Sequence, residues 1–106
     1  MRYMLMICGD ENASVELDPV EPWIEEMEGR GVRLGGDRLR PTSEATTVRV
    51  RDGEVLLADG PFAETKEQMG GYDLIECRDL DEAIEIASKH PVAPFGSIEV
   101  RPLWSD

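Results

Sequence analysis

The connection between residues 59 and 71, DGPFAETKEQMGG, gathers several side chains that could bind or transform a small molecule. Asp59 directly follows EVLLA, an apolar run typical of a strand, and a carboxylate at the end of a buried strand can be partly desolvated. Desolvation would raise its pKa and suit it to acid–base catalysis. Phe62 and Trp23 could form apolar walls beside it, and Lys66 or Arg49 could hold an anionic substrate. These residues are the candidate site.

The same connection also has a purely structural interpretation. Asp59-Gly60-Pro61 can form a turn, and Gly70-Gly71 permits close backbone approach or a β-bulge at the start of the next strand. Lys66 and the neighbouring glutamates would then form a solvated face. The residues alone leave both interpretations open.

The composition is that of an ordinary folded domain. The 106 residues suit one domain, which at this length buries roughly two-thirds of its unfolded surface without metals or disulfides. The excess of 23 acidic over 11 basic residues gives a net charge of −12, which repels nucleic acids and anionic membranes. No apolar run approaches the roughly 20 residues that cross a bilayer, and MRYMLMICGD lacks a signal-peptide cleavage site. We therefore expect a cytoplasmic protein without direct nucleic-acid or membrane contact.

The cysteines and the histidine do not indicate a metal site. Cys8 and Cys77 each end an apolar run, so buried free thiols are expected, with a redox pair as the alternative if the two strands are neighbours. A single histidine and two separated cysteines do not make a zinc site, and Gly35-Gly36 is not part of a phosphate-binding loop motif. The sequence therefore predicts neither a metal nor a cofactor.

Apolar runs bounded by turn residues predict the strands. Residues 2–8 carry apolar side chains on both faces, which favours a strand in the middle of a sheet. Residues 46–50 and 54–58 flank Asp52-Gly53, which favours a two-residue type I′ turn. The resulting register pairs Val50 with Val55 and Val48 with Leu57, all on one face.

Two helices are predicted. Asp18 is expected to cap the first, with Pro19 in the first turn and Glu21 completing a capping box. Its apolar stripe would consist of Val20, Trp23, Ile24 and Met27. Asp79 is expected to cap the second, with Glu82 at the box position. Its stripe would consist of Leu80, Ala83, Ile84 and Ala87.

The order of these elements indicates an α+β fold. Residues 71–77 and 97–104 are predicted to be further strands, and Pro102 marks either a sheet edge or the end of its strand. Residues 32–40 are either a broken strand or a loop. The simplest arrangement is a ferredoxin-like split βαβ plan with an added β-hairpin. The two helices would cover one face of the sheet. Since the strand at residues 2–8 is apolar on both sides, a second copy of the chain is expected to cover the other face, which predicts a homodimer.

Several stretches resemble the DGPF-domain branch of the YCII-related family. Asp59-Gly60-Pro61-Phe62 is the motif that gives the branch its name, and Glu64-Thr65-Lys66-Glu67 follows it. The resemblance extends to YMLMICGDE, ATTVRVRDGEV, LDEAIEIASKHP and GSIEVRP, so it covers nearly the whole chain. It implies one YCII-related domain over residues 1–106 that dimerises into a shared α+β barrel.

The resemblance implies two classes of function. Many family members carry a histidine and an aspartate regarded as a catalytic dyad, and at least one relative acts in the breakdown of chlorinated aromatics. DGPF members also occur with sigma-70-like transcription factors. Here residues 19–30, where the histidine is expected, contain none, and His90 follows the second helix, where the helix dipole would favour it. The alternatives are an enzyme that uses Asp59 on an anionic or aromatic compound and a non-catalytic dimeric sensor or accessory module.

Overall fold

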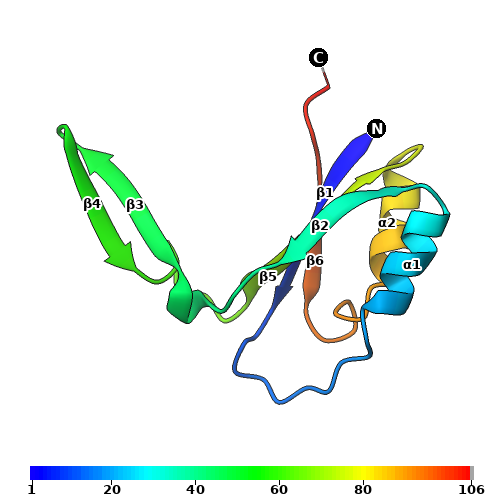
Figure 1. Ribbon diagram of the computed structural model, residues 1–106, viewed down its shortest axis with the longest axis horizontal. Helices are drawn as coiled ribbons and strands as arrows, with labels where there is room; N and C mark the ends of the chain where they lie inside the picture. The colour runs from blue at the N-terminus through cyan, green and yellow to red at the C-terminus, as the bar shows by residue number, and fades with distance from the viewer. Residues whose placement is uncertain (106) are drawn as a thin grey trace.

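The computed structural model describes residues 1–105, which form a four-stranded antiparallel sheet, two helices and a separate two-stranded hairpin (Figure 1). In chain order the elements are β1 (Arg2–Gly9), α1 (Glu21–Gly29), β2 (Arg33–Arg38), the 3₁₀ turn η1 (Thr42–Glu44), β3 (Thr46–Arg51), β4 (Glu54–Asp59), β5 (Gln68–Glu76), α2 (Leu80–Ser88) and β6 (Ser97–Pro102).

The strand order of the sheet is β2-β5-β1-β6. Each strand–helix–strand unit is split by a strand of the other unit, because β5 lies between β1 and β2 while β1 lies between β5 and β6. The predicted α+β class is confirmed, and the order is consistent with a ferredoxin-like plan. The central position of β1 is confirmed too, and β6 is an edge strand that ends at Pro102.

Residues 32–40, which the sequence left open, contain the edge strand β2. Its pairing with β5 is irregular between Arg33 and Gly35. At Gly36 a Cβ atom would lie 2.3 Å from the carbonyl oxygen of Tyr72, so only glycine permits this close approach. The two glycines therefore shape the strand rather than end it.

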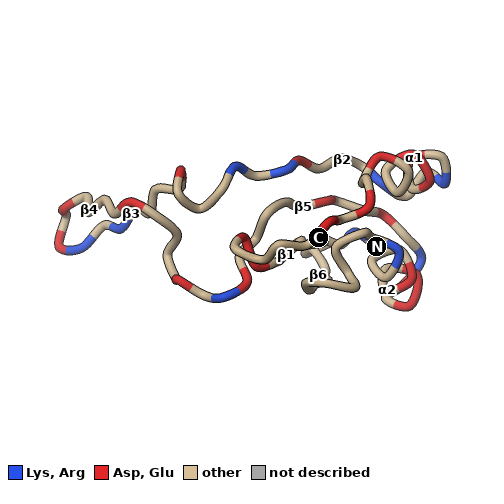
Figure 2. Tube along the Cα trace, turned by 90° about the horizontal axis from the view of Figure 1, so that it is seen from below, with Lys and Arg blue, Asp and Glu red and all other residues tan. Residues whose placement is uncertain are grey.

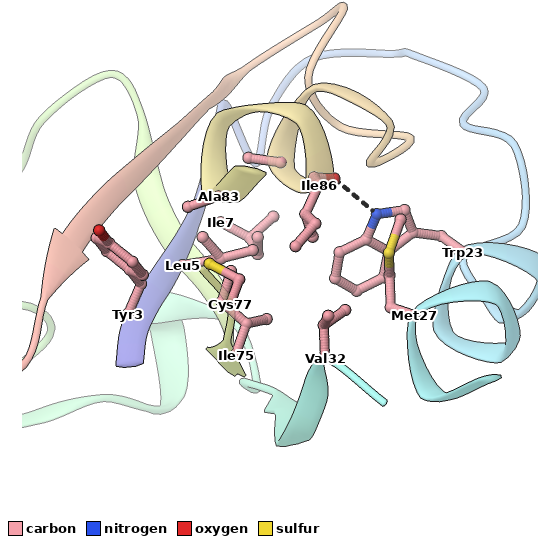
Figure 3. Close-up of a cluster of buried hydrophobic side chains, with 11 residues drawn as sticks. Tyr3, Leu5, Ile7, Trp23, Met27, Val32, Ile75, Cys77, Ala83 and Ile86 are labelled. Carbon is pink, nitrogen blue, oxygen red and sulfur yellow. Dashed lines mark hydrogen bonds between the residues drawn. The ribbon is translucent and has the colours of Figure 1, made fainter. Parts of the chain in front are cut away.

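The core lies between the sheet and the helices (Figure 3). Tyr3, Leu5 and Ile7 of β1 are buried there, while Met4 and Met6 on the opposite face are half-buried. The predicted stripe of α1 packs into this core, with Trp23 and Met27 buried and Val20 and Ile24 partly buried.

The first helix begins two residues later than predicted. It starts at Glu21, and Val20 occupies the cap position without a side-chain hydrogen bond, so the expected cap at Asp18 is wrong. With Asp18 as the cap, Pro22 would be the fourth helical residue, and its missing N–H would leave the Asp18 carbonyl without the first helical bond. Starting at Glu21 places Pro22 in the first turn, where no N–H is required.

The second helix begins as predicted. The Asp79 Oδ1 atom accepts a hydrogen bond from the Glu82 backbone N–H at 2.9 Å. The predicted stripe is wrong at two positions, because Leu80 and Ile84 are half exposed while Ile86 is fully buried beside Ala83 and Ala87. The buried positions 83, 86 and 87 follow the i, i+3, i+4 spacing that places side chains on one helix face.

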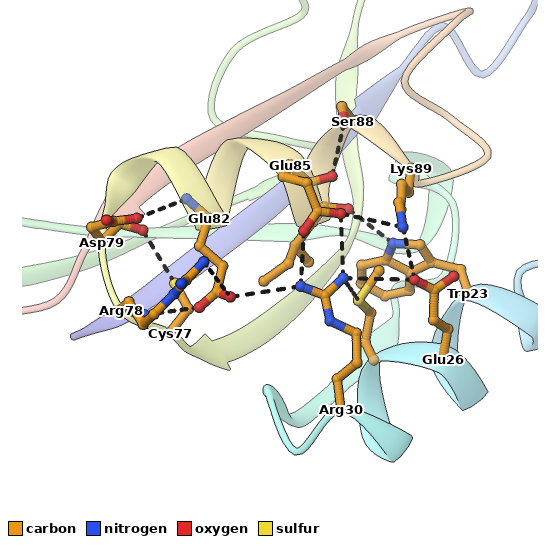
Figure 4. Close-up of polar contacts among 12 residues, drawn as sticks. Trp23, Glu26, Arg30, Cys77, Arg78, Asp79, Glu82, Glu85, Ser88 and Lys89 are labelled. Atoms are coloured by element: carbon orange, nitrogen blue, oxygen red, sulfur yellow. Dashed lines mark hydrogen bonds and ion pairs between the residues drawn. The ribbon is translucent and has the colours of Figure 1, made fainter.

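Charged side chains join the exposed edges of the two helices (Figure 4). The Arg30 guanidinium donates to both carboxylate oxygens of Glu85, at 2.8 and 3.2 Å, and Lys89 Nζ lies 2.9 Å from Glu26 Oε2. These pairs hold the helices side by side over the sheet. Neither helix of the described residues is long and apolar enough to cross a membrane.

The hairpin of β3 and β4, residues 46–59, forms an arm that projects away from the sheet (Figures 1 and 2). Asp52 and Gly53 have φ angles of 52° and 79°, which confirms the type I′ turn, and the predicted register is confirmed at all four apolar positions. Because of the arm, the radius of gyration is 15.7 Å, against about 13 Å for a compact chain of this length.

Candidate functional site

A cavity of about 660 Å³ lies beside the sheet at the end of the helix layer. Its walls come from residues 10–18 after β1, from the neighbouring ends of β1, β2 and β5, and from the turn that follows α2. The apolar surface comes from Ile7, Ile24, Val92 and Phe95, and the buried polar residues of the lining are Asp73 and His90.

A buried ion pair forms one polar part of the lining. Arg33 Nε donates to Asp73 Oδ1 at 2.8 Å, and the two side chains are only about a tenth exposed. Arg33 also donates to Glu28 Oε2 at 3.0 Å and to the carbonyl of Gly36 at 3.3 Å. Burial raises the pKa of Asp73, and the neighbouring Arg33 opposes part of that rise. The arginine therefore already has its acceptors within the chain.

His90 is the other buried polar group, with 6% of its surface exposed. Its Nδ1 atom accepts a hydrogen bond from the Val92 backbone N–H at 3.1 Å, and its ring meets the edge of Trp23 with centroids 4.8 Å apart. Burial lowers the pKa of His90 from 6.5 to about 4, so the ring is neutral at neutral pH. The expected role as a cation favoured by the helix dipole is therefore wrong, because that interaction requires a charged ring.

The two cysteines do not form a redox pair. The Cys77 backbone N–H donates to the carbonyl of Met1, whereas Cys8 pairs with Met69 at the other end of β1. At about 3.3 Å per strand residue the two thiols are more than about 20 Å apart. Both are free, as expected, but only Cys77 is buried, while Cys8 is half-buried. Burial raises the pKa of each thiol, which keeps them protonated and weakly nucleophilic.

One chain does not bring the sequence-predicted site residues together. Asp59 and Arg49 lie exposed on the arm, and Phe62 is 82% exposed. Lys66 lines a separate small cavity of about 180 Å³. Trp23 belongs to the core, where it is 4% exposed and donates from Nε1 to the carbonyl of Ile86 (Figure 3). None of them lines the large cavity, although the Trp23 ring packs against His90, which does line it.

The connection that contains the motif has clear structural contacts. Gly60 has a φ of 98°, and its N–H donates to the carbonyl of Ala45 at 2.8 Å. The Gln68 side-chain amide donates to the carbonyls of Ala63 and Thr65. The register of β5 against β1 shifts at Gly70, which confirms the expected bulge. The structural interpretation of these residues therefore holds, whatever else they do.

A match to the YCII-related domain covers residues 1–105. The chain belongs to the YCII-related family. A similar segment occurs in a protein of Rhizobium meliloti (strain 1021) named Uncharacterized protein R00369, which is 53% identical over 68 residues. The match covers 62% of this chain and 55% of the Rhizobium protein, so this chain spans about half the length of that relative.

Sequence reasoning missed the groups at the cavity of this YCII-related domain. Asp73 left a detectable signal, because it alternates in phase with buried Ile75 in β5 and with Cys77 just after the strand. A carboxylate at such a position requires a buried partner. His90 and Arg33 left no such signal, since neither lies within an alternating apolar run.

Proposed function

We propose that this YCII-related domain binds a small organic molecule in the cavity beside His90 and acts as a homodimer. The cavity carries the first part of the proposal, because about 660 Å³ lies within the range of roughly 300–1,000 Å³ typical of ligand pockets. Such pockets combine apolar walls with a few placed polar groups. His90 and the Arg33–Asp73 pair are groups of this kind.

The enzymatic form of the proposal assigns acid–base chemistry to Asp59. This carboxylate is exposed at the end of β4 in one chain, so a second copy would have to bring it to a cavity. The alternative is a non-catalytic sensor or accessory module for a sigma-70-like regulator. The pairing of Arg33 with Asp73 supports this alternative, because groups that already neutralise each other suit binding better than proton transfer.

A thermal-shift screen of neutral aromatic compounds, phenols and small organic acids tests ligand binding. Leu17 lies at the exposed part of the cavity lining, whereas Leu34 is similarly exposed outside it. A ligand of the cavity should stabilise the wild type and Leu34→Lys but not Leu17→Lys. Equal shifts in all three forms, or no shift with any compound, would contradict the proposal.

Asp59→Asn then separates the two forms of the proposal. Because Asp59 is exposed in a single chain, the substitution should leave the fold stable. Loss of the ligand-induced shift in the dimer would support a role for Asp59 at the partner's cavity. An unchanged shift would remove Asp59 from the site and favour the sensor.

The arm supports the homodimer. Val48, Val50, Val55 and Leu57 share one face of it and are each 57% to 69% exposed. An isolated two-stranded hairpin is marginally stable in water, and a continuous apolar face of this kind marks an interaction surface. The other face of the arm carries Arg49, Arg51 and a single leucine, Leu56.

A second uncovered apolar surface lies on the same chain. Met4, Met6 and Leu74 are half-buried on the sheet face that the helices do not cover. A two-fold dimer allows each copy to cover the uncovered surfaces of the other, which is how most homo-oligomers bury such surfaces. The arm and the open sheet face would then belong to one continuous interface.

Neighbouring leucines on opposite faces of the arm give a matched test. Leu57→Lys places a charge on the apolar face, and Leu56→Lys places the same charge on the other face. By light scattering we expect the wild type and Leu56→Lys to have twice the single-chain mass of 11.8 kDa. We expect Leu57→Lys to have the mass of a single chain. A monomeric wild type, or an equal effect of both substitutions, would contradict the interface.

We also propose a cytoplasmic location. The chain has two cysteines, and both are free thiols. Free thiols are typical of reducing compartments, whereas small secreted domains commonly use disulfides. Fractionation of the producing cells tests this location directly, and recovery of the protein outside the cytoplasm would contradict it.

A further inference from the structure

The position of the proton on His90 follows from its contacts. The ring is neutral at neutral pH, and its Nδ1 atom accepts from the Val92 N–H, so the ring proton lies on Nε2. Within residues 1–105 no side chain accepts a hydrogen bond from this Nε2–H. Every fully enclosed side-chain nitrogen or oxygen of these residues has a hydrogen-bond partner, so an atom without one must be at least partly exposed. The Nε2 atom is therefore not fully enclosed, and His90 itself lines the cavity.

The charges around the cavity disfavour an anion. Five carboxylate residues line it against two arginines. Arg33 is already occupied by Asp73, Glu28 and the Gly36 carbonyl. Arg38 is exposed at the end of β2, where water screens its charge.

An anion entering the cavity would lose hydration without gaining a buried positive partner, since His90 is neutral. The sequence left open an anionic or an aromatic ligand, and the cavity lining favours the aromatic one. A neutral oxygen acceptor incurs no such penalty, and it can accept a hydrogen bond from His90 Nε2–H.

We propose that the ligand is an uncharged organic molecule, with an apolar body and a carbonyl-type oxygen that accepts a hydrogen bond from His90 Nε2–H. This inference rests on the proposed ligand-binding function and narrows it to one chemical class. Ile7, Ile24, Val92 and Phe95 supply the surface that the apolar body would contact.

Three probes of one shape test the chemical class on the wild-type protein. They are 3-phenylpropanamide, 3-phenylpropanoate and 3-phenylpropylamine, measured by calorimetry at neutral pH. We expect the amide to bind best, roughly tenfold tighter than the carboxylate. Tighter binding of the carboxylate or of the amine would overturn the inferred class and leave ligand binding standing. No binding of any probe, with no hit in the thermal-shift screen, would overturn both.

Two substitutions of His90 test the hydrogen bond. The Asn side-chain oxygen can replace Nδ1 as the acceptor for the Val92 N–H, so His90→Asn keeps the turn and loses the donor. The Gln amide can replace Nε2–H, so His90→Gln keeps the donor and loses the acceptor. The amide affinity should fall roughly tenfold in the Asn variant and stay near wild type in the Gln variant. Equal affinities of the wild type and the Asn variant would overturn the role of His90.

A spectroscopic readout does not depend on folding of the variants. His90 is the single histidine of the chain, so the ¹⁵N spectrum of its imidazole contains two assignable nitrogens. The Nε2 resonance should carry the proton, and 3-phenylpropanamide should shift it far more than Nδ1. A proton on Nδ1, or an Nε2 resonance unmoved by saturating amide, would overturn the inference.

Discussion

Acidification should destabilise this fold through His90. The ring is buried, and its pKa in the folded chain is about 4, against 6.5 for an exposed histidine. Below pH 6.5 the unfolded chain therefore binds a proton that the folded chain excludes. Since the folded-state pKa is the lower one, this contribution to stability is complete above pH 6.5 and is lost as the pH falls toward 4.

The size of the loss follows from the difference between the two pKa values. Each pH unit between them changes the free energy of unfolding by about 1.36 kcal/mol. At about pH 5, some 1.5 units below the ordinary value, His90 should destabilise the fold by about 2 kcal/mol. By about pH 4 the loss should reach about 3 kcal/mol.

Urea denaturation of the wild type and His90→Asn, at about pH 7.5 and about pH 5, isolates this contribution. The chain has 23 acidic residues, whose titration also changes stability, but they are present in both proteins and cancel in the difference. Asn does not titrate and can keep the hydrogen bond from Val92 N–H. The stability of the wild type relative to the variant should fall by about 2 kcal/mol over this interval. A constant difference would refute the reasoning and place the folded-state pKa of His90 near its ordinary value.

Two further predictions concern the residues beside the cavity. Arg33→Met should destabilise the fold by about 3 kcal/mol in urea, because it leaves the buried Asp73 carboxylate unpaired, and adding Asp73→Asn should restore much of this loss. A loss below about 1 kcal/mol would indicate an ion pair that is effectively solvent-exposed. Gly36→Ala should destabilise by about 1–3 kcal/mol, because its Cβ would overlap the Tyr72 carbonyl, whereas Gly35→Ala, with open space around it, should stay within about 0.5 kcal/mol. Equal effects of the two glycine substitutions would contradict the close contact.

The elements that sequence predicted well are those whose signals are local. Asp52-Gly53 defines the turn and register of the arm, because both positions have positive φ angles. Asp79 and Glu82 define the start of α2 within a single helical turn. The two apolar faces of β1 predicted its central position, because the pattern is complete within one strand.

The buried face of α2, the strand β2 and the cavity could not be predicted, because each depends on parts of the chain that are distant in sequence. Whether Ile84 or Ile86 faces the core depends on how α2 rotates over the sheet, and both residues fit an apolar stripe. β2 is held by pairing with β5, which lies more than thirty residues later. The residues after β1, the strand ends and the turn after α2 form the cavity together, so no single stretch of sequence contains its pattern.

The motif at residues 59–62 lies where the arm joins the rest of the chain. Asp59 pairs with Thr46 as the last residue of β4, and the positive φ of Gly60 turns the chain at the base of the arm. Besides the Gly60 N–H bond to the Ala45 carbonyl, the Thr47 hydroxyl of β3 donates to the Gly60 carbonyl. Both bonds connect β3 and the residue before it to the residue that follows β4. The motif therefore sets the direction of the arm within one chain. In the proposed homodimer the arm also carries Asp59, so any chemistry of that carboxylate would take place where a second copy receives the arm. The structural and catalytic interpretations of the motif would then be two consequences of the same proposed interface.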